Sequence, residues 1–212
     1  MTHGARETEI KLAVPDARTG RGLLRAAGFR VSKRRVFETN TVFDTPELGL
    51  RRAATMLRVR QAGGVATVTY KGPPEVGRHK SREELELEIS DAGTMGAIME
   101  RLGLGAVFHY DKYRTEYRQP GRSGIATLDE TPVGVYLELE GTPTWIDRAA
   151  RKLGFAEDDY ITASYARLWL EWCEWHGVGE ADMVFKEGSP QRRRVRQRQP
   201  RGAALPLSDR VR

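Results

Sequence analysis

Charged and uncharged residues alternate in the stretch Glu7-Thr8-Glu9-Ile10-Lys11, near the start of the chain. In a β-strand, residues two positions apart point to the same face, so Glu7, Glu9 and Lys11 would share one face. Water solvates such a row of charges at little cost, whereas a concave interior tolerates it only when each charge has a partner or a ligand. The stretch therefore predicts either the solvated face of a strand or part of a site for a charged ligand.

The same alternation recurs along the chain, most sharply over residues 80–89, where Leu85 and Leu87 lie opposite a row of charged residues. Hairpin turns such as Gly63-Gly64 indicate an antiparallel sheet, and the helices need the aliphatic face of that sheet for packing. If the sheet closes into a barrel, the charged face becomes a polar lumen. The residues expected on that face are Glu7, Glu9, Glu84, Glu86, Asp129, Glu138, Glu140, Lys11, Arg58, Arg60, Lys71, Lys80, Arg82, Lys112 and Arg114.

This balanced set of acids and bases indicates the kind of ligand. Clustered carboxylates bind hard divalent cations such as Mg²⁺ or Mn²⁺ through oxygen, and Arg and Lys bind phosphate. Acids alone would suggest Ca²⁺ and bases alone nucleic acid, whereas both together suit a polyphosphate bridged by a metal. The sequence shows no His/Cys ligand set, no phosphate-binding glycine loop and no Ser–His arrangement, and His79 and His109 are interpreted as structural or surface residues.

The elements that would position these residues can be predicted from pattern and from turn signals. Strands are expected at residues 6–14, 29–43, 56–60, 65–71, 80–89, 107–117, 125–129 and 136–141. Helices are expected after Asp16, at residues 93–102 and 145–153, and from about Thr162. The aromatic stripe of the last helix, from Tyr165 to Trp175, is interpreted as core packing.

Composition fits a water-soluble globular chain. Its 212 residues allow one large domain or two small ones, with 39% hydrophobic and 30% charged residues. No apolar run approaches the roughly 20 residues that a membrane helix needs, and no signal peptide is recognisable. The single Cys173 fits a reducing cytoplasm, so a cytoplasmic location without membrane contact is expected.

The net charge of +6 comes from the end of the chain. Residues 188–212 contain eight Arg and one Asp, a charge of +7, which leaves −1 for residues 1–187. We therefore expect a domain over residues 1–176 and a disordered Arg-rich tail over residues 177–212. Nucleic acid could contact the tail, although a solvated extension without a dedicated role is the simpler interpretation.

The order of these motifs resembles that of the CYTH superfamily, the triphosphate tunnel metalloenzymes. The likeness covers most of residues 5–172 and rests on several motifs in sequence order. They are Glu7-x-Glu9-x-Lys11, Phe43-Asp44-Thr45-Pro46, Leu57-Arg58-Val59-Arg60, Thr69-Tyr70-Lys71-Gly72-Pro73, Arg82-x-Glu84, Lys112-x-Arg114, Leu128-Asp129-Glu130 and Leu137-Glu138-Leu139-Glu140. The resemblance implies an α+β fold, an eight-stranded antiparallel β-barrel tunnel with a charged lumen and helices packed on the outside.

The resemblance also implies roles for individual residues. The expected metal ligands, for Mg²⁺ or Mn²⁺, are Glu7, Glu9, Asp129, Glu138 and Glu140. The expected substrate-binding residues are Lys11, Arg58, Arg60, Lys71, Arg82, Glu84, Lys112 and Arg114. The residues expected to carry catalysis are Glu7, Glu9, Lys11, Glu138 and Glu140.

Three functions are compatible with this resemblance. Metal-dependent hydrolysis of a small-molecule triphosphate is favoured, because the sequence contains no motif that would read a nucleobase. A class IV adenylate cyclase and a non-catalytic polyphosphate or nucleotide sensor remain alternatives. Relatives often carry Lys where Ala163 precedes Ser164-Tyr165, and Arg167 is one turn away as a possible substitute. The chain could be a monomer or a homodimer.

Overall fold

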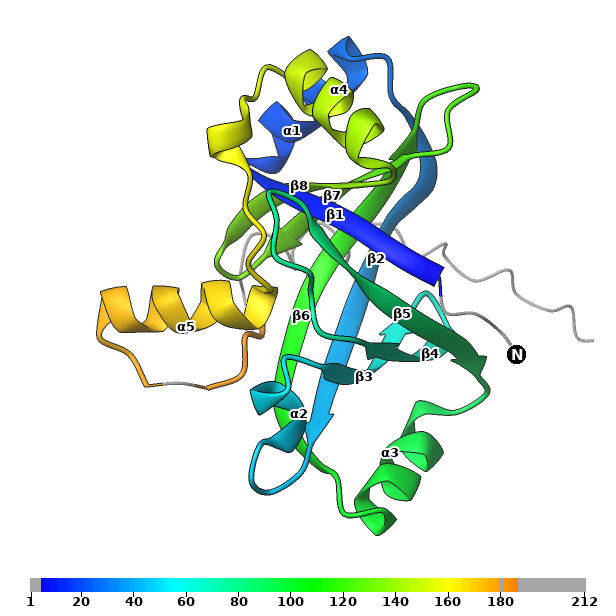
Figure 1. Ribbon diagram of the computed structural model, residues 1–212, viewed down its shortest axis with the longest axis vertical. Coiled ribbons are helices and arrows are strands. Elements are labelled where there is room, and N and C mark those ends of the chain that lie inside the picture. The colour runs from blue at the N-terminus through cyan, green and yellow to red at the C-terminus, as the bar shows by residue number, and fades with distance from the viewer. Residues whose placement is uncertain (1–4, 180, 187–212) are drawn as a thin grey trace, which may run out of the picture.

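The computed structural model describes residues 5–179 and 181–186, and its centre is a closed barrel of antiparallel strands (Figure 1). The order of the eight strands around the barrel is β1-β5-β4-β3-β2-β6-β7-β8, and β8 pairs with β1 to complete the ring. The strands are β1 (Ala5–Val14), β2 (Arg30–Asp44), β3 (Met56–Ala62), β4 (Val65–Lys71), β5 (Lys80–Ile89), β6 (Gly105–Arg118), β7 (Ile125–Thr131) and β8 (Gly134–Glu140). The predicted fold class is therefore confirmed.

The helices lie outside the barrel, as the aliphatic face of the strands requires. They are α1 (Ala17–Ala26), α2 (Gly49–Arg52), α3 (Ala92–Arg101), α4 (Pro143–Leu153) and α5 (Tyr165–His176), with a 3₁₀ turn, η1 (Glu157–Asp159). Side-chain caps define where they begin: Asp16 accepts a hydrogen bond from the Thr19 amide at 2.7 Å, and Ser164 accepts one from the Arg167 amide at 3.2 Å. The last helix thus begins after Ser164 rather than near Thr162.

The main core lies between the barrel wall and helices α1 and α4. It is built on the outward-facing residues of β1, β7 and β8, among them the fully buried Ile10, Leu128 and Leu139. Gly20 of α1 packs so close to the sheet that a Cβ atom there would lie 2.7 Å from the Leu128 side chain. Helix α3 covers a second, smaller cluster that includes Phe43. The aliphatic side chains of β1, β7 and β8 are thereby removed from water, and the inner face is left to the charged rows. The expectation that helices cover the whole aliphatic face is wrong for β5, whose Leu85 and Leu87 are exposed.

Strands β2 and β6 form the longest pair, and their pairing is irregular at one end. The register shifts between Val31 and Lys33 and again between Lys33 and Val36. Such bulges bend a strand and increase its twist. The first residues of β2 consequently lie against the last residues of β6, with Arg30 directly opposite Arg118.

Beyond α5, residues 181–186 pack on the barrel wall as a strap. Met183 exchanges backbone hydrogen bonds with His109 and Asp111 of β6 at 2.9 Å, and its side chain is fully buried. The Phe185 ring lies 5.4 Å from the ring of Tyr113. The predicted boundary at residue 176 assigned these residues to the tail, but their contacts place them on the domain. Residues 187–212, where most of the predicted tail lies, are outside the described residues.

Helix α5 projects away from the barrel, so its aromatic stripe is only partly core (Figure 1). Tyr165 is buried, whereas Trp175 is 85% exposed. Between them, the rings of Trp169 and Trp172 stack at 5.1 Å. The prediction that the stripe is core packing holds for the start of the helix and is wrong for its end. No helix among the described residues combines the length and apolar content that crossing a bilayer demands.

Candidate functional site

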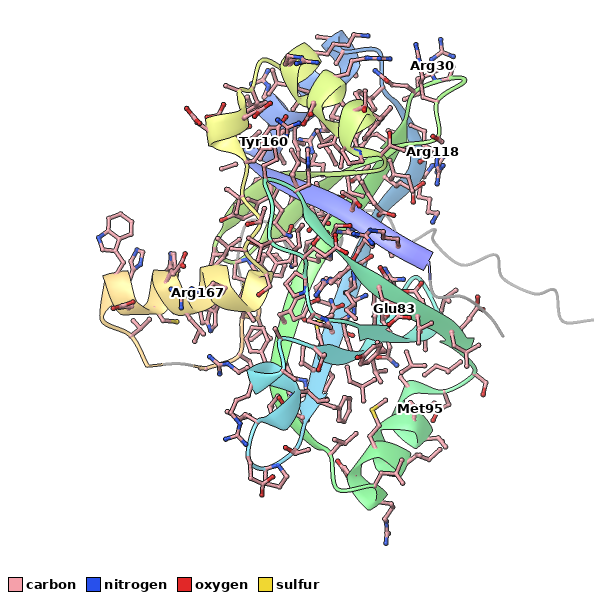
Figure 2. The ribbon with its side chains drawn as sticks, in the orientation of Figure 1. Arg30, Glu83, Met95, Arg118, Tyr160 and Arg167 are labelled. Atoms are coloured by element: carbon pink, nitrogen blue, oxygen red, sulfur yellow. The ribbon has the colours of Figure 1, made fainter. Side chains whose placement is uncertain are left out.

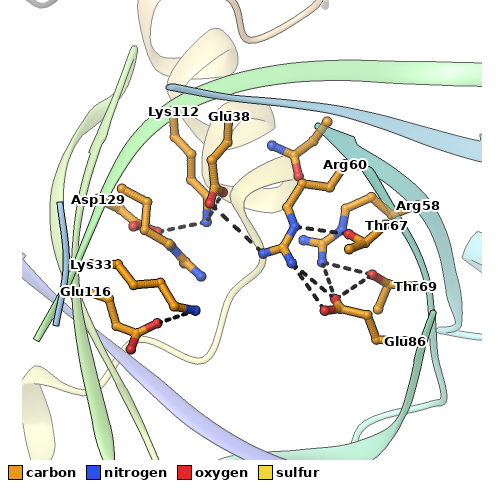
Figure 3. A network of polar contacts seen from close by, with 12 residues as sticks. Lys33, Glu38, Arg58, Arg60, Thr67, Thr69, Glu86, Lys112, Glu116 and Asp129 are labelled. Atoms are coloured by element: carbon orange, nitrogen blue, oxygen red, sulfur yellow. Dashed lines mark hydrogen bonds and ion pairs between the residues drawn. The ribbon is translucent and has the colours of Figure 1, made fainter. Parts of the chain in front are cut away.

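The predicted charged face is the inner wall of the barrel. The strand registers place the charged rows on one face, and ion pairs join them across the interior from β1, β3, β4, β5, β6, β7 and β8. Figure 3 shows part of this network from close by, with side chains from several strands meeting in one space. The structure thus brings together every residue that the sequence nominated for the site: Glu7, Glu9, Lys11, Arg58, Arg60, Lys71, Arg82, Glu84, Lys112, Arg114, Asp129, Glu138 and Glu140.

One wall of the lumen carries an excess of carboxylates. Glu7 and Glu84 both contact the ammonium of Lys71, with Glu84 at 3.1 Å. Glu140, an exposed residue at the end of β8, faces the same group, and partial desolvation of its carboxyl together with the negative charges of Glu7 and Glu84 raises its pKa to about 7. Burial and the nearby Glu7 also raise the pKa of Glu84. Lys71 and Arg82, whose Nε atom lies 3.5 Å from Glu7, bring two positive charges against these three carboxylates, so the group keeps an excess of negative charge.

Next to this group, lysines and glutamates alternate. Lys11 lies 3.3 Å from Glu138 and 3.5 Å from Glu9, and Lys80 lies 3.5 Å from Glu9. Burial alone would raise the pKa of Glu9, but Lys11 and Lys80 outweigh it and lower that pKa to about 2. Burial and the positive charges of Lys11 and Arg82 lower the pKa of Lys80 to about 8. Lys80 is therefore the lumen ammonium that can release its proton nearest to neutral pH.

Asp129 occupies the most enclosed position and is held entirely by donors. It is fully buried, and it accepts hydrogen bonds from Lys112 at 3.0 Å, from Arg114 at 2.6 and 2.7 Å and from the Tyr165 hydroxyl at 2.8 Å. Arg114 also contacts Glu138. With its oxygens engaged in this way, Asp129 orients the basic groups beside it.

The opposite wall, formed by β3 and β4, carries arginines held by hydroxyl groups. Arg58 donates to the Tyr110 hydroxyl and to Thr69, both at 3.2 Å, and its Nε has no hydrogen-bond partner among the described residues. Arg60 donates to Thr67 and to Glu86, both at 3.2 Å (Figure 3). The hydroxyl partners of Arg58 are neutral, and its nearest carboxylate, Glu86, is 3.9 Å away, so most of its positive charge is available to an anionic ligand. Glu86 compensates more of the charge of Arg60.

The structure adds lumen residues that the sequence did not single out. Glu38 lies 3.5 Å from the Lys112 ammonium, and Asn40 is 1% exposed with an amide oxygen that lacks a partner within the described chain. Neither follows a charged alternation, because their neighbours on β2 are aromatic or Thr. Tyr110 and Tyr165 were also missed, since aromatic residues in such patterns are usually core.

The lumen has one open and one filled end, and β6 shows the change along its inner row. The exposed fraction of the side chain is 3% at Lys112, 21% at Arg114, 11% at Glu116 and 46% at Arg118, so the row reaches solvent at Arg118. In the other direction the row reaches Tyr110, whose ring lies 6.3 Å from that of Tyr165. That ring in turn lies 5.8 Å from Tyr136, and all three are buried with Met183 in one cluster. The tyrosines fill this end.

The contacts of Arg167 and His79 decide what had been expected of these two residues. Arg167 does not replace the lysine that relatives often carry at position 163, because its side chain is 63% exposed and pairs with Glu171 on the surface of α5 (Figure 2). His79 lies outside the lumen, where its Nε2 atom is 2.7 Å from Asp147 of α4. It joins the loop before β5 to that helix.

The lumen offers oxygen ligands for a divalent cation without presenting a finished metal centre. Among the described residues, no three acidic, His or Cys side chains surround one point as metal ligands do. The crowded carboxylates Glu7, Glu84 and Glu140 nevertheless fit a hard cation, which would relieve the repulsion that raises the pKa of Glu140. The donor chemistry therefore suits Mg²⁺ or Mn²⁺.

A closed antiparallel barrel with a lumen of paired acids and bases defines the class of protein, a tunnel for a highly charged ligand. Residues 5–165 match the model of the CYTH domain, and the chain belongs to this family. The family generally binds triphosphates with divalent metals.

Named relatives agree with this assignment. A protein of Methanocaldococcus jannaschii with the name "Putative adenylate cyclase" is 30% identical over 173 residues, which cover 76% of this chain and 97% of the relative. A solved structure from Pyrococcus horikoshii is 25% identical with a TM-score of 0.65, and covers 78% of this chain and 99% of its own. A Hippeastrum protein described as a "putative adenylyl cyclase" with a dominant triphosphatase activity has a TM-score of 0.57 at 21% identity, over 82% of this chain and 97% of its own. At that identity the likeness shows the fold.

Proposed function

We propose that this protein is a divalent-metal-dependent hydrolase of a triphosphate, either inorganic tripolyphosphate or an organic triphosphate, bound inside the barrel. The observation that carries the proposal is the two-sided lumen. Guanidinium and ammonium groups with replaceable partners face a group of carboxylates whose charges are not balanced. Phosphoryl oxygens suit the first wall, and a metal that bridges them suits the second.

The basic residues would bind and orient the substrate. Arg58 can turn from its hydroxyl partners to phosphoryl oxygens, and Arg60 from Thr67 and Glu86. Lys112 and Arg114 would bind phosphate with N–H groups that do not contact Asp129, because Asp129 is fully buried and needs both partners. In the transition state the same cations stabilise negative charge on the transferred phosphoryl group.

The carboxylates that would hold Mg²⁺ or Mn²⁺ are the crowded Glu7, Glu84 and Glu140, with Glu9 and Glu138 beside them. Asp129, also an expected ligand, has its oxygens engaged by Lys112, Arg114 and Tyr165. A bound metal would neutralise phosphoryl oxygens and lower the pKa of a coordinated water. In the hydrolysis, a water oxygen bonds to the terminal phosphorus as the bond from that phosphorus to the bridging oxygen breaks. A carboxylate of this group that does not hold the metal can accept the proton of the water. Lys80, with a pKa of about 8, can donate a proton to the leaving diphosphate.

Adenylate cyclase activity is the second candidate, and the name of the Methanocaldococcus jannaschii relative favours it. The same lumen would hold the triphosphate of ATP, and the ribose 3′-hydroxyl would attack the α-phosphorus and release diphosphate. The open end of the lumen would then have to hold the nucleoside.

One experiment separates these candidates. The purified full chain is incubated with tripolyphosphate, ATP or thiamine triphosphate in Mg²⁺ or Mn²⁺, and the products are resolved by chromatography. Orthophosphate from at least one substrate supports the hydrolase, and cyclic AMP supports the cyclase. Tight binding of all three substrates without turnover would overturn both in favour of a sensor.

A further inference from the structure

Basic side chains gather outside the open end of the lumen, where the start of β2 meets the end of β6. We call Arg30, Lys33, Arg34, Arg118 and Arg122 the basic collar; all five are exposed. Arg30 and Arg118 are directly paired residues of the two strands, and Figure 2 shows them at the same corner of the molecule. The collar is a surface feature, separate from the residues assigned to the triphosphate.

The collar continues a row of side chains that begins inside the barrel. Arg118 follows Arg114 and Glu116 on the inner face of β6, and its side chain is the most exposed of the three. Glu116 connects the two regions, because it lies 3.0 Å from the Lys33 ammonium (Figure 3) and 3.0 Å from Arg118 Nε. A chain of negative charges that leaves the lumen at this end would therefore meet the collar next.

The positive charge of the collar is poorly compensated. Arg30, Arg34 and Arg122 form no ion pair within residues 5–179 and 181–186, and the other two collar cations share the single carboxylate of Glu116. Since residues 1–187 together carry −1, this concentration of charge is local. Such a field attracts polyanions and raises their association rate.

The chemistry of the collar favours a polyanion without bases. The segments that form it, Arg30–Arg34 and Arg118–Ser123, contain no Phe, Tyr or Trp. Proteins that bind single-stranded nucleic acid usually combine basic groups with aromatic rings on which the bases stack. A surface of Arg and Lys alone recognises phosphate groups and little else.

We propose that the substrate is long-chain inorganic polyphosphate, with its terminal phosphates in the lumen and the following phosphates across the basic collar. This inference rests on the proposed triphosphatase function and deepens it. Tripolyphosphate fills the lumen alone, whereas a longer chain gains the collar contacts. The value of kcat/KM should therefore rise with chain length from tripolyphosphate to tetrapolyphosphate and long-chain polyphosphate.

The test compares two double variants with the same change in charge. Arg30→Glu/Arg34→Glu reverses two collar residues that lack ion pairs, and Arg52→Glu/Arg101→Glu reverses two exposed residues on α2 and α3, at the opposite end of the molecule (Figure 1). The ratio of kcat/KM for long-chain polyphosphate to kcat/KM for tripolyphosphate should fall by about tenfold in the collar variant and stay unchanged in the control. An equal fall in both variants, or none in either, overturns the proposal.

Binding measured in EDTA distinguishes failure of this inference from failure of the proposed function. If the protein hydrolyses tripolyphosphate but binds long-chain polyphosphate equally well in both variants, the hydrolase stands and the collar proposal is overturned. If it shows no turnover but binds long-chain polyphosphate through the collar, the polyphosphate site stands without the reaction. A collar that instead strengthens binding only of a 5′-triphosphorylated RNA would be a nucleic-acid surface, which also overturns the proposal.

Discussion

Glu138 and Glu140 lie two positions apart on one face of β8, yet their surroundings differ. Burial would raise the pKa of Glu138, but Arg114 and Lys11 outweigh it and hold that pKa well below its usual range. Partial desolvation and two other carboxylates raise the pKa of Glu140 to about 7. Glu138 is therefore already paired with Arg114 and Lys11 in the ligand-free protein. Glu140 is the carboxylate whose repulsion by its neighbours a bound metal would relieve most.

Replacing either residue by Gln should lower turnover. Glu140→Gln should not destabilise the protein, whereas Glu138→Gln should lower Tm, because it removes the partner of the buried Lys11 and of Arg114. Metal activation contributes several kcal/mol, and each 1.4 kcal/mol is a factor of about ten in rate, so we expect a loss of roughly a hundredfold or more in Glu138→Gln and in Glu140→Gln. Arg58→Ala should instead raise the KM for triphosphate and leave metal affinity largely intact. Calorimetric metal titration beside steady-state kinetics checks this. Metal affinity and turnover like those of the natural protein in both Gln variants would exclude this region as the catalytic centre.

The raised pKa of Glu140 also predicts how the stability of the metal-free protein depends on pH. Its folded-state pKa of about 7 lies above its ordinary value of 4.5, so between these values the folded state binds more protons than the unfolded state. The contribution of Glu140 to stability is complete below pH 4.5 and is lost as the pH rises to 7. Thermal melts in EDTA should show Glu140→Gln gaining in Tm over the natural protein at pH 8 and not at pH 4.5.

The exposed residue Glu88 provides a control for that measurement. Glu88→Gln removes the same charge from β5 at a position open to solvent. If Glu88→Gln and Glu140→Gln raise Tm equally at pH 8, the gain reflects net charge alone and the crowding of Glu140 is not its cause.

At the scale of elements, the strap separates two ways of shortening the chain. Deleting residues 188–212 should leave Tm unchanged, because the last buried contact described is that of Phe185. Deleting residues 181–212 exposes the surface under Met183 and Phe185, and should lower Tm by roughly 5–10 °C. Melting curves of both truncations check the prediction. Equal Tm values for the two would show that the strap contributes no stability.

The strands could be predicted because one physical requirement fixes their pattern. The aliphatic residues of β1 and β8 must face the helices, so the charges at alternate positions were forced inward. Strand β5 shows the same alternation, although its Leu85 and Leu87 stay exposed. The irregular start of β2 could not be predicted, because its two register shifts depend on pairing with β6. The strap was missed for a similar reason: Met183 pairs through a single isolated bridge, too short to leave a pattern.

Part of the site was hidden for reasons of residue type. The carboxylates and cations were found from their spacing, whereas Asn40 is a lone amide in a strand without charge alternation. Tyr165 belongs to an aromatic stripe that is equally compatible with packing of the whole helix in the core, so the sequence did not mark it as a site residue. Only the tertiary structure shows that its hydroxyl donates to Asp129.

For the whole molecule, the balance of charges inside the barrel is the main constraint. Ion pairs rather than continuous apolar packing line the lumen. The desolvation of buried charges offsets much of the attraction between them, so such pairs add little net stability. The outer core between the barrel and helices α1 and α4 must therefore supply most of the stability. A ligand can then rearrange the interior while the barrel keeps its shape.

Tyr110, Tyr136 and Tyr165 fill one end of the lumen, so substrate enters and products leave through the other end. The two products must therefore leave in a fixed order. The fragment cleaved nearer to the open end leaves first, and the deeper fragment leaves last. In steady-state kinetics the last product to leave competes directly with substrate, whereas the first gives mixed inhibition. We expect one of orthophosphate and diphosphate to be a competitive inhibitor and the other a mixed one. Purely competitive inhibition by both would mean that products depart in random order, by more than one route.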